Sequence, residues 1–309
     1  MISQTLGLRK LRLSILGAQI FLNIFALQTI AIAQNEIIPD TTLGVEPSEV
    51  IPLDSAGLPI DVIDGGAIRG QNLFHSFLIF NILEGRGAYF RIPNNNIQTI
   101  FSRVTGNVPS EILGTLGSFN PPGIAASPDF YFINPNGILF GPNSSLDLPA
   151  SFMATTADAV ELGNGGLYSA ISPETSNLLS IDPSALLFGS RDPSLITNQA
   201  LLGLPATGSL LNGPISFPQE TLLDGRILPF QWGLQVVDGK TLGLAGGQIR
   251  IEGTLTALGG RVEVSAPEEG RVEIDKIPNG FSLSFPENLS LGDIEFGNGD
   301  INASGPGGG

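Results

Sequence analysis

Phe130-Tyr-Phe-Ile-Asn-Pro-Asn-Gly-Ile-Leu-Phe-Gly-Pro-Asn143 is the stretch of sequence that decides the fold. Its centre, Asn134-Pro-Asn-Gly137, predicts a turn, because Pro presets φ at the first corner position, Asn tolerates a left-handed conformation at the second, and Gly follows without steric cost. The flanking segments 130–133 and 138–140 are rich in aromatic and β-branched residues, which favours strands. The stretch therefore predicts short strands joined by tight corners, and it offers no group for covalent chemistry.

The composition agrees with many short strands. The 309 residues include 40 Gly and 23 Pro, and 42% are hydrophobic while only 14% are charged. This is enough apolar material for a substantial core that is divided by frequent turns. Cysteine is absent, which excludes thiolate nucleophiles, cysteine metal sites and lipidation at cysteine.

The N-terminus has the layout of a secretory signal peptide. Basic residues Arg9, Lys10 and Arg12 precede an apolar run, and Ala31-Ile-Ala33 stands where cleavage is expected. An uncleaved membrane anchor is the alternative, because residues 13–33 are about long enough to span a bilayer. Polar residues interrupt that run, so we predict a signal peptide over residues 1–33, cleaved after Ala33, and a secreted or cell-surface protein that passes through the periplasm.

The charge excludes a nucleic-acid footprint. The whole chain carries a formal net charge of −15, from 14 basic and 29 acidic residues. Residues 1–33 hold three of the basic residues and none of the acidic ones, so the mature chain has a net charge of −18. An acidic balance favours solubility and does not name a partner.

The front part of the mature chain is divided by Pro and Gly. Residues 34–72 predict an extended lead-in and N-terminal cap, and strands follow from residue 73 to 90 around a Gly-containing turn. Apolar residues in the segment 97–116 recur at helical spacing, which predicts one or two helical turns there. Beyond it, strands are expected to start near residues 130, 138, 146 and 152, as in a coil built from short steps.

The back part predicts an excursion followed by regular rungs. Residues 165–225 are rich in Leu, Pro and Ser without a clear period, which indicates an extra-helical loop or hairpin. From residue 226 to 309, apolar and polar residues alternate as in half-buried strands. Ile249, Val272 and Ile294 are spaced by 23 and 22 residues, a near-constant step that is expected of stacked rungs. A β-sandwich is the alternative. The coil of 73–309 ends within a turn-like segment, so we expect it to be the truncated front portion of a longer coil.

Several motifs resemble one family. The chain resembles the N-terminal secretion domain of filamentous haemagglutinin, an exported partner in bacterial two-partner secretion. The motifs that carry the resemblance are Gly70-Gln-Asn-Leu-Phe-His-Ser-Phe77, Ser102-Arg-Val-Thr-Gly106, Ile112-Leu-Gly-Thr-Leu116, Phe132-Ile-Asn-Pro-Asn-Gly-Ile138 with Phe140-Gly-Pro-Asn143, and Ser151-Phe-Met-Ala-Thr-Thr-Ala157.

The resemblance implies an all-β fold, a right-handed parallel β-helix with an N-terminal cap and extra-helical β-hairpin or loop excursions. It also implies export by the Sec machinery and recognition by the periplasmic domains of a cognate outer-membrane transporter, with passage in the unfolded state. In the family the Asn-Pro-Asn-Gly-Ile motif is tied to secretion competence and turn geometry. Here it falls on Asn134, Pro135, Asn136, Gly137 and Ile138. A second motif is less well kept, and its positions here are Pro93, Asn94, Asn95 and Asn96.

Sites for catalysis or metal binding are weakly supported. His75 is the one histidine, and its setting between Phe74 and Ser76 favours a structural or surface role over a catalytic triad. Acidic residues such as Glu252 and Glu263 alternate with Ile and Val, as on a solvated strand face. Gly297-Asn-Gly-Asp300 does not sustain a calcium-binding repeat. We predict no metal and no cofactor.

The sequence therefore predicts a secreted, non-enzymatic, adhesin-like exoprotein. Its domain is expected to direct export and to template folding of the coil, with a role in adhesion to a host or neighbouring-cell surface ligand. A polysaccharide-cleaving β-helix enzyme is one alternative, and a stand-alone structural or binding module on the cell surface is another. The sequence names neither the ligand nor the oligomeric state.

Overall fold

The computed structural model describes residues 35–55, 58–201 and 233–305. In these residues the elements are strands, apart from one 3-10 turn at Pro173–Thr175. The described part holds no helix that is both long and apolar enough to cross a membrane. The signal peptide prediction for residues 1–33 lies outside the described residues.

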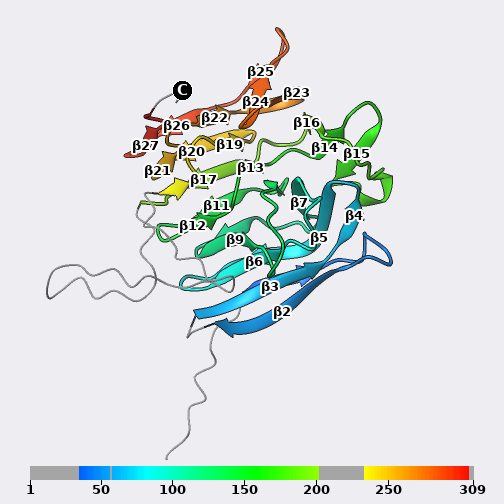
Figure 1. The fold of residues 1–309 in the computed structure, drawn as a ribbon. Coiled ribbons are helices and arrows are strands. Elements are labelled where there is room, and N and C mark those ends of the chain that lie inside the picture. Colours follow the sequence, from blue (N-terminus) through cyan, green and yellow to red (C-terminus); the bar gives the residue numbers. More distant parts are fainter. Residues whose placement is uncertain (1–34, 56–57, 202–232, 306–309) are drawn as a thin grey trace, which may run out of the picture. The chain divides into compact units, whose positions relative to one another are not determined.

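Most strands form a parallel coil (Figure 1). Along the chain, the strands return in the same cyclic order to three parallel sheets, and each strand pairs with its equivalent in a neighbouring rung. The first sheet contains β5 (Asn72–Asn81), β7 (Thr99–Val104), β10 (Asp129–Ile133), β13 (Phe152–Thr155), β19 (Thr241–Ala245) and β22 (Arg261–Ser265). The second contains β8 (Ser110–Ile112), β11 (Ile138–Phe140), β17 (Leu195–Asn198), β20 (Gln248–Ile251) and β26 (Ile294–Phe296).

The third sheet comes in two stretches. The first stretch contains β3 (Leu58–Gly65), β6 (Gly87–Arg91), β9 (Thr115–Phe119) and β12 (Ser145–Asp147), and the second contains β18 (Leu234–Gln235), β21 (Thr254–Thr256) and β27 (Asp300–Asn302). One turn of the coil thus contributes a strand to each of the three sheets. The predicted strand starts near 130, 138, 146 and 152 are confirmed, because β10 to β13 begin within a residue or so of those positions.

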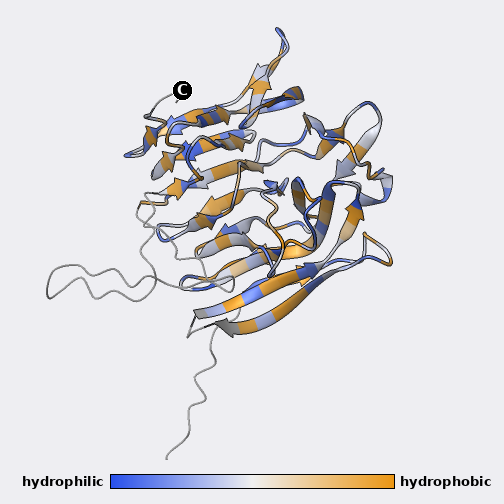
Figure 2. Ribbon diagram, viewed as in Figure 1, coloured by the Kyte–Doolittle hydropathy of each residue, from blue (hydrophilic) through white to orange (hydrophobic). Residues whose placement is uncertain are grey.

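Alternation within each strand builds the core of the coil. The register aligns one inward-facing position through successive rungs of the first sheet, and its occupants are Leu73, Ile100, Phe130, Phe152, Leu242 and Val262. All but Val262 are fully buried. Hydrophobic and hydrophilic residues alternate in colour along the coil strands (Figure 2). Since side chains alternate between the two faces of a strand, the neighbouring positions lie on the outer face of the sheet.

Antiparallel strands cover that outer face. They are β14 (Ala159–Leu162), β15 (Gly166–Ser169), β16 (Pro183–Phe188), β23 (Pro267–Ile277), β24 (Gly280–Ser284) and the short β25 (Ser290–Leu291). Their apolar side chains pack with Phe74, Phe101 and Tyr131 of the first sheet in a second buried cluster. The structure thus has the predicted fold class, a parallel β-helix with extra-helical β-hairpins.

Antiparallel strands also cap the N-terminal end of the coil. β1 (Glu36–Pro39) and β4 (Ala67–Arg69) pair with β5, and β2 (Ser48–Ser55) pairs with β3. These strands occupy edges that the first rung would otherwise leave open, which is how natural sheets limit edge-to-edge association.

The predicted rung spacing in the back part is wrong. Ile249 pairs directly with Ile294, whereas Val272 lies in β23, which runs antiparallel to β16 and β24. An extra-helical hairpin therefore occupies the place that the spacing assigned to a rung. The pattern misleads because a half-buried hairpin strand and a half-buried coil strand alternate in the same way.

Two local expectations also need correction. The segment predicted to form helical turns contains β7, in which Ile100 and Val104 face the coil and Phe101 faces the second cluster. Burial on both faces of a strand produces a dense apolar run that imitates helical spacing. Within the predicted excursion 165–225, β17 pairs in the coil between β11 and β20. Residues 202–225 of that excursion lie outside the described residues.

Candidate functional site

The Asn-Pro-Asn-Gly segment is the corner between β10 in the first sheet and β11 in the second. The Gly137 amide donates to the Asn134 carbonyl at 3.2 Å, and the Asn136 amide donates to the Asn134 side-chain Oδ1 at 3.0 Å. Pro135 fits between them because its ring fixes φ. The turn predicted from the sequence is therefore present, and the Asn134 side chain helps to close it.

The two asparagines of this corner also bind the preceding rung. The Asn134 Nδ2 donates to the Val108 carbonyl at 3.1 Å and to the Ser110 Oγ at 2.9 Å. The Asn136 Nδ2 donates to the Gly106 carbonyl at 2.7 Å. Asn134 and Ser110 are fully buried, so the bond between them satisfies polar groups that water does not reach. The side chains thus fasten the corner to the one beneath it in the coil.

Gly137 and Ile138 bring the chain close to the following rung. Gly137 has a φ of 121°, a conformation that L side chains rarely adopt. A Cβ atom built on Gly137 would lie 3.0 Å from the Leu195 carbonyl oxygen. Ile138 is buried and pairs with Ser110 on one side and Ile196 on the other. Glycine is therefore required both by the backbone conformation and by the close approach of β17.

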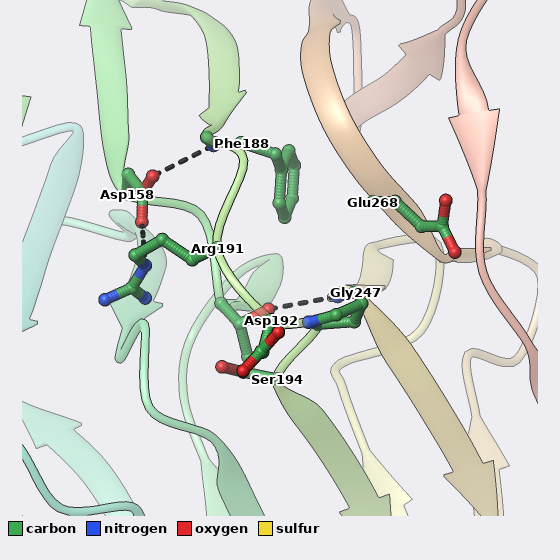
Figure 3. Close-up of a pocket in the computed structure, with 10 residues that line it drawn as sticks. Asp158, Phe188, Arg191, Asp192, Ser194, Gly247 and Glu268 are labelled. Atoms are coloured by element: carbon green, nitrogen blue, oxygen red, sulfur yellow. Dashed lines mark hydrogen bonds and ion pairs between the residues drawn. The ribbon is translucent and has the colours of Figure 1, made fainter.

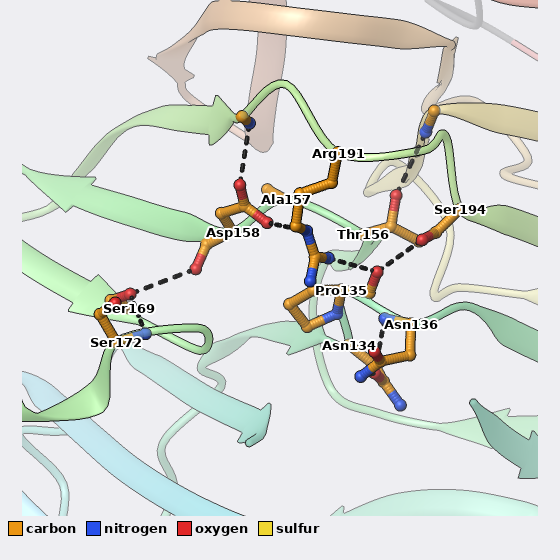
Figure 4. A network of polar contacts seen from close by, with 12 residues as sticks. Asn134, Pro135, Asn136, Thr156, Ala157, Asp158, Ser169, Ser172, Arg191 and Ser194 are labelled. Atoms are coloured by element: carbon orange, nitrogen blue, oxygen red, sulfur yellow. Dashed lines mark hydrogen bonds and ion pairs between the residues drawn. The ribbon is translucent and has the colours of Figure 1, made fainter. Parts of the chain in front are cut away.

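The Pro135 carbonyl is the acceptor that faces the following rung (Figure 4). It accepts hydrogen bonds from the Arg191 Nη2 at 2.7 Å and from the Ser194 Oγ at 2.6 Å. The Arg191 Nε lies 3.1 Å from the Asp158 Oδ1, and the other oxygen of Asp158 accepts from the Gly189 amide at 2.9 Å. Side chains from the chain before and after the extra-helical strands thus meet at this corner.

A shallow polar pocket adjoins the corner (Figure 3). Its lining includes Asp158, Arg191, Asp192 and Ser194, with Glu268 of β23 across the pocket from Asp158. Its empty space, open to solvent, is about 230 Å³. One of its carboxylates already pairs with Arg191, and the described residues contain no cluster of side chains able to hold a metal ion. The arrangement fastens backbone segments and contains no nucleophile paired with a base.

The second motif forms a different corner of the coil, between β6 and β7. The Asn96 amide donates to the Asn94 Oδ1 at 2.8 Å, which repeats the side-chain closure seen at Asn134. The Asn95 Oδ1 accepts from the Ala125 amide at 2.7 Å. Asn95 and Asn96 are exposed and Pro93 is half-buried. The two motifs therefore share turn chemistry, and no hydrogen bond between described residues joins them.

His75 lies inside the coil, fully buried. Its Nδ1 is 3.1 Å from the Ser48 Oγ, and its ring packs against Phe90. Burial lowers the pKa of His75 to about 3, so the imidazole is neutral in the folded protein. This setting agrees with a structural role for His75.

The family model of the TPS secretion domain matches residues 35–308. The chain belongs to this family, the two-partner secretion (TPS) domains. Among solved structures it is similar to the HMW1 secretion domain from Haemophilus influenzae, with 19% identity and a TM-score of 0.46 over 87% of this chain and 55% of that one. It is also similar to the filamentous hemagglutinin secretion domain, with 14% identity and a TM-score of 0.35 over 87% and 99%. No curated protein matches.

The family match confirms the resemblance seen in the sequence motifs. The chain spans about half the length of the HMW1 chain that it matches. The chain is therefore a TPS secretion domain over residues 35–308.

Sequence reasoning missed the partners of the corner in this TPS domain. Ser110, Arg191 and Ser194 contact the motif, but the sequence pattern predicted none of them as a site residue. Ser110 lies one rung earlier in the chain, and the other two lie beyond the extra-helical strands. The one available signal was Leu195-Ile-Thr-Asn198, a short β-branched run that follows Arg191 within the predicted excursion.

Proposed function

We propose that this TPS domain directs its protein through a cognate outer-membrane transporter and then starts the folding of the coil outside the cell. The match to the TPS family over residues 35–308 is the observation that carries this proposal. The transporter's periplasmic domains recognise the unfolded or partly folded chain after Sec export and cleavage behind Ala33. The mature chain divides into a lead-in and cap, 34–72, and a coil domain, 73–309.

The corner at Asn134–Ile138 is the proposed secretion motif. Its asparagine side chains bond to the preceding rung, so a finished rung offers acceptors that hold the next corner in place. Each new strand then pairs with an edge that already exists, which avoids long-range loop closure. Pro93, Asn94, Asn95 and Asn96 are the proposed second motif at an earlier corner, where the Asn95 side chain accepts from the Ala125 amide of the following rung. Adhesion to a surface ligand is the downstream role that we propose for the exported protein.

Replacement of Asn136 tests this function. Asn136→Ile removes the bond to the Gly106 carbonyl and keeps the chain length. Asn143→Ile is the matched control, because Asn143 also follows a proline at a corner and bonds only to an exposed Glu84 among the described residues. We expect extracellular protein to fall at least about fivefold for Asn136→Ile and to stay unchanged for the control.

The same assay needs cells with and without the cognate transporter. Secretion that is unchanged without the transporter would exclude the proposed export route. Sequencing the N-terminus of the extracellular protein tests the signal peptide, and Gln34 is the expected first residue.

A further inference from the structure

One backbone carbonyl receives two donors from a distant part of the chain. Arg191 and Ser194 both donate to Pro135, and they follow it by 56 and 59 residues. Pro135 is buried, so its carbonyl depends on protein donors for hydrogen bonding. Between Pro135 and these donors the chain completes a rung and leaves the coil as β14 to β16, and directly after Ser194 it re-enters the coil as β17. The corner is therefore complete only after this return.

Asp158 joins the two ends of that excursion. It directly precedes β14, where the chain leaves the coil, and its oxygens contact the Gly189 amide and the Arg191 guanidinium just after β16. A Cβ atom on Gly189 would lie 2.4 Å from the Asp158 Oδ2, so Gly189 lets the backbone approach the carboxylate closely. One carboxylate therefore fixes the base of the excursion and orients the arginine that reaches Pro135 (Figure 4).

The planar guanidinium suits this arrangement. Its Nε faces Asp158 while its Nη2 faces Pro135, and the fixed fork of donors allows both contacts at once. The Ser194 carbonyl also accepts from the Gln248 amide of the next rung at 3.1 Å. The contacts thus run from the corner to the return segment and on to the following rung.

We propose that Asp158, Arg191 and Ser194 form a latch that locks the Asn134–Gly137 corner once the extra-helical strands β14 to β16 have formed. They are positioning residues for the export-linked folding of the domain, and this role rests on the proposed function. The latch sets where the coil resumes, because Arg191 and Ser194 immediately precede β17, which stacks on β11. An export motif early in the chain is thereby coupled to a segment that emerges later.

The second Asn corner provides an internal comparison. It has the same side-chain closure, from the Asn96 amide to the Asn94 Oδ1. Its side-chain link to another rung is the Asn95 bond to the Ala125 amide, and no arginine of the described residues donates a hydrogen bond to it. The latch therefore predicts that the two corners respond differently to the same substitution.

Hydrogen exchange in the full mature chain tests the latch. Arg191→Ala is compared with Arg250→Ala, whose side chain is equally exposed at 43% and pairs with Glu295 in the same sheet. For Arg191→Ala we expect exchange of the Asn136 and Gly137 amides to speed up about five- to tenfold, with no change at Asn96. Arg191→Lys is expected to restore only part of the protection, because an ammonium group lacks the planar fork of donors that contacts Asp158 and the Pro135 carbonyl at once.

Two results would overturn the latch. One is unchanged exchange at Gly137 in Arg191→Ala, and the other is an equal increase at every coil amide, which would indicate only a general loss of stability. Asp158→Asn provides a second variant, since it weakens the hold on Arg191 without touching Pro135. It should raise exchange at Gly137 in the same direction, and an unchanged rate there would also contradict the latch.

A binding measurement separates the latch from the export function. The urea-unfolded mature chain is mixed with the periplasmic domains of the cognate transporter, and binding of Arg191→Ala should equal that of the unchanged chain within about twofold. Extracellular yield should nevertheless fall at least about threefold, because the folded corner at Asn134–Gly137 is less stable. Unchanged yield would contradict the coupling. Absent binding for every variant would refute the proposed function, while the exchange data would still decide the latch.

Discussion

Asn134 is a side chain whose bonds are all internal to the coil. It is fully buried, and it links the turn to Val108 and Ser110 of the preceding rung. Asn134→Ala leaves the buried Ser110 hydroxyl without this donor, so we expect the free energy of unfolding to fall by about 1–3 kcal/mol. Urea denaturation measures it. Asn95→Ala is the control, because Asn95 is exposed and its loss should cost less than about 1 kcal/mol. Equal effects of the two changes would contradict the importance of burial.

His75 makes the stability of the domain depend on pH. Burial lowers its folded-state pKa from the usual 6.5 to about 3. Below pH 6.5 the imidazole is therefore protonated in the unfolded chain but stays neutral in the folded chain. Stability is therefore full above pH 6.5 and is lost as pH falls toward 3. Between pH 6.5 and 4.5 we expect a loss of about 2–3 kcal/mol.

The variant His75→Gln isolates this effect, because it cannot titrate and His75 is the one histidine of the chain. The difference between the two proteins in urea denaturation, measured from pH 7 to 4.5, should shrink steadily as the pH falls. A constant difference across that range would show that His75 does not titrate between the two states.

The corner shows which residue roles can be predicted from sequence. Pro135 and Gly137 have conformational preferences that act locally, so the turn at Asn134–Gly137 was predictable. The partners Arg191 and Ser194 were not, because their contacts depend on where a later strand stacks. A hydrogen bond between residues 56 positions apart leaves no periodic signal in a single sequence.

Arg103 joins three structural elements on the outer side of β7. Its Nε donates to Ser76 in β5 at 2.8 Å, its Nη1 to the Ser169 carbonyl in β15 at 2.6 Å, and its Nη2 to Thr42 beside the cap at 2.8 Å. The guanidinium carbon lies 4.3 Å from the centre of the Tyr168 ring. The side chain is fully buried, so its bonds connect the cap, the coil and the extra-helical hairpin.

Replacement of Arg103 should therefore loosen the cap. Arg103→Met keeps much of the apolar volume but leaves the buried Ser76 hydroxyl and Ser169 carbonyl without this donor, and we expect a loss of about 2–4 kcal/mol in the free energy of unfolding. Arg250→Met should cost less than about 1 kcal/mol, since its ion pair with Glu295 is exposed. Urea denaturation followed by amide exchange in β1 measures both. Unaltered exchange in β1 would show that Arg103 does not hold the cap.

At the level of strands, the sequence predicts which face of a strand is apolar better than it predicts which strands pair. Arg261-Val-Glu-Val-Ser265 and Arg271-Val-Glu-Ile-Asp275 have the same alternation, yet the first is coil strand β22 and the second lies in hairpin strand β23. Val272 and Ile274 of β23 are buried between exposed residues, whereas Val262, Glu263 and Val264 of β22 are all half-buried. The alternation therefore predicts an apolar and a polar face, but it does not predict which strands pair. Pairing direction is set by the turns and by the surface that each strand covers.

For the coil as a whole, growth by stacking means that every rung presents an edge to the next. The cap strands occupy this edge at the N-terminal end, through β1, β2 and β4. At the other end, β22, β26 and β27 each pair with an earlier rung, and no strand in the described residues pairs with their far side. The rung that ends the described coil therefore has free backbone donors and acceptors.

This rung also carries exposed apolar side chains, which predicts self-association of the mature chain when it is produced as residues 34–309 alone. Ile294, Phe296 and Ile301 are exposed by 39%, 56% and 38%, and they lie on the unpaired strands β26 and β27. Exposed edges with apolar side chains pair with other edges, and charge suppresses this pairing. We expect the sedimentation coefficient of the mature chain to rise with concentration, and Phe296→Lys with Ile301→Lys to abolish that rise. Ile171→Lys, at a site exposed by 47% outside the coil, should leave it unchanged, because only the coil edge offers backbone groups for a second copy to pair with.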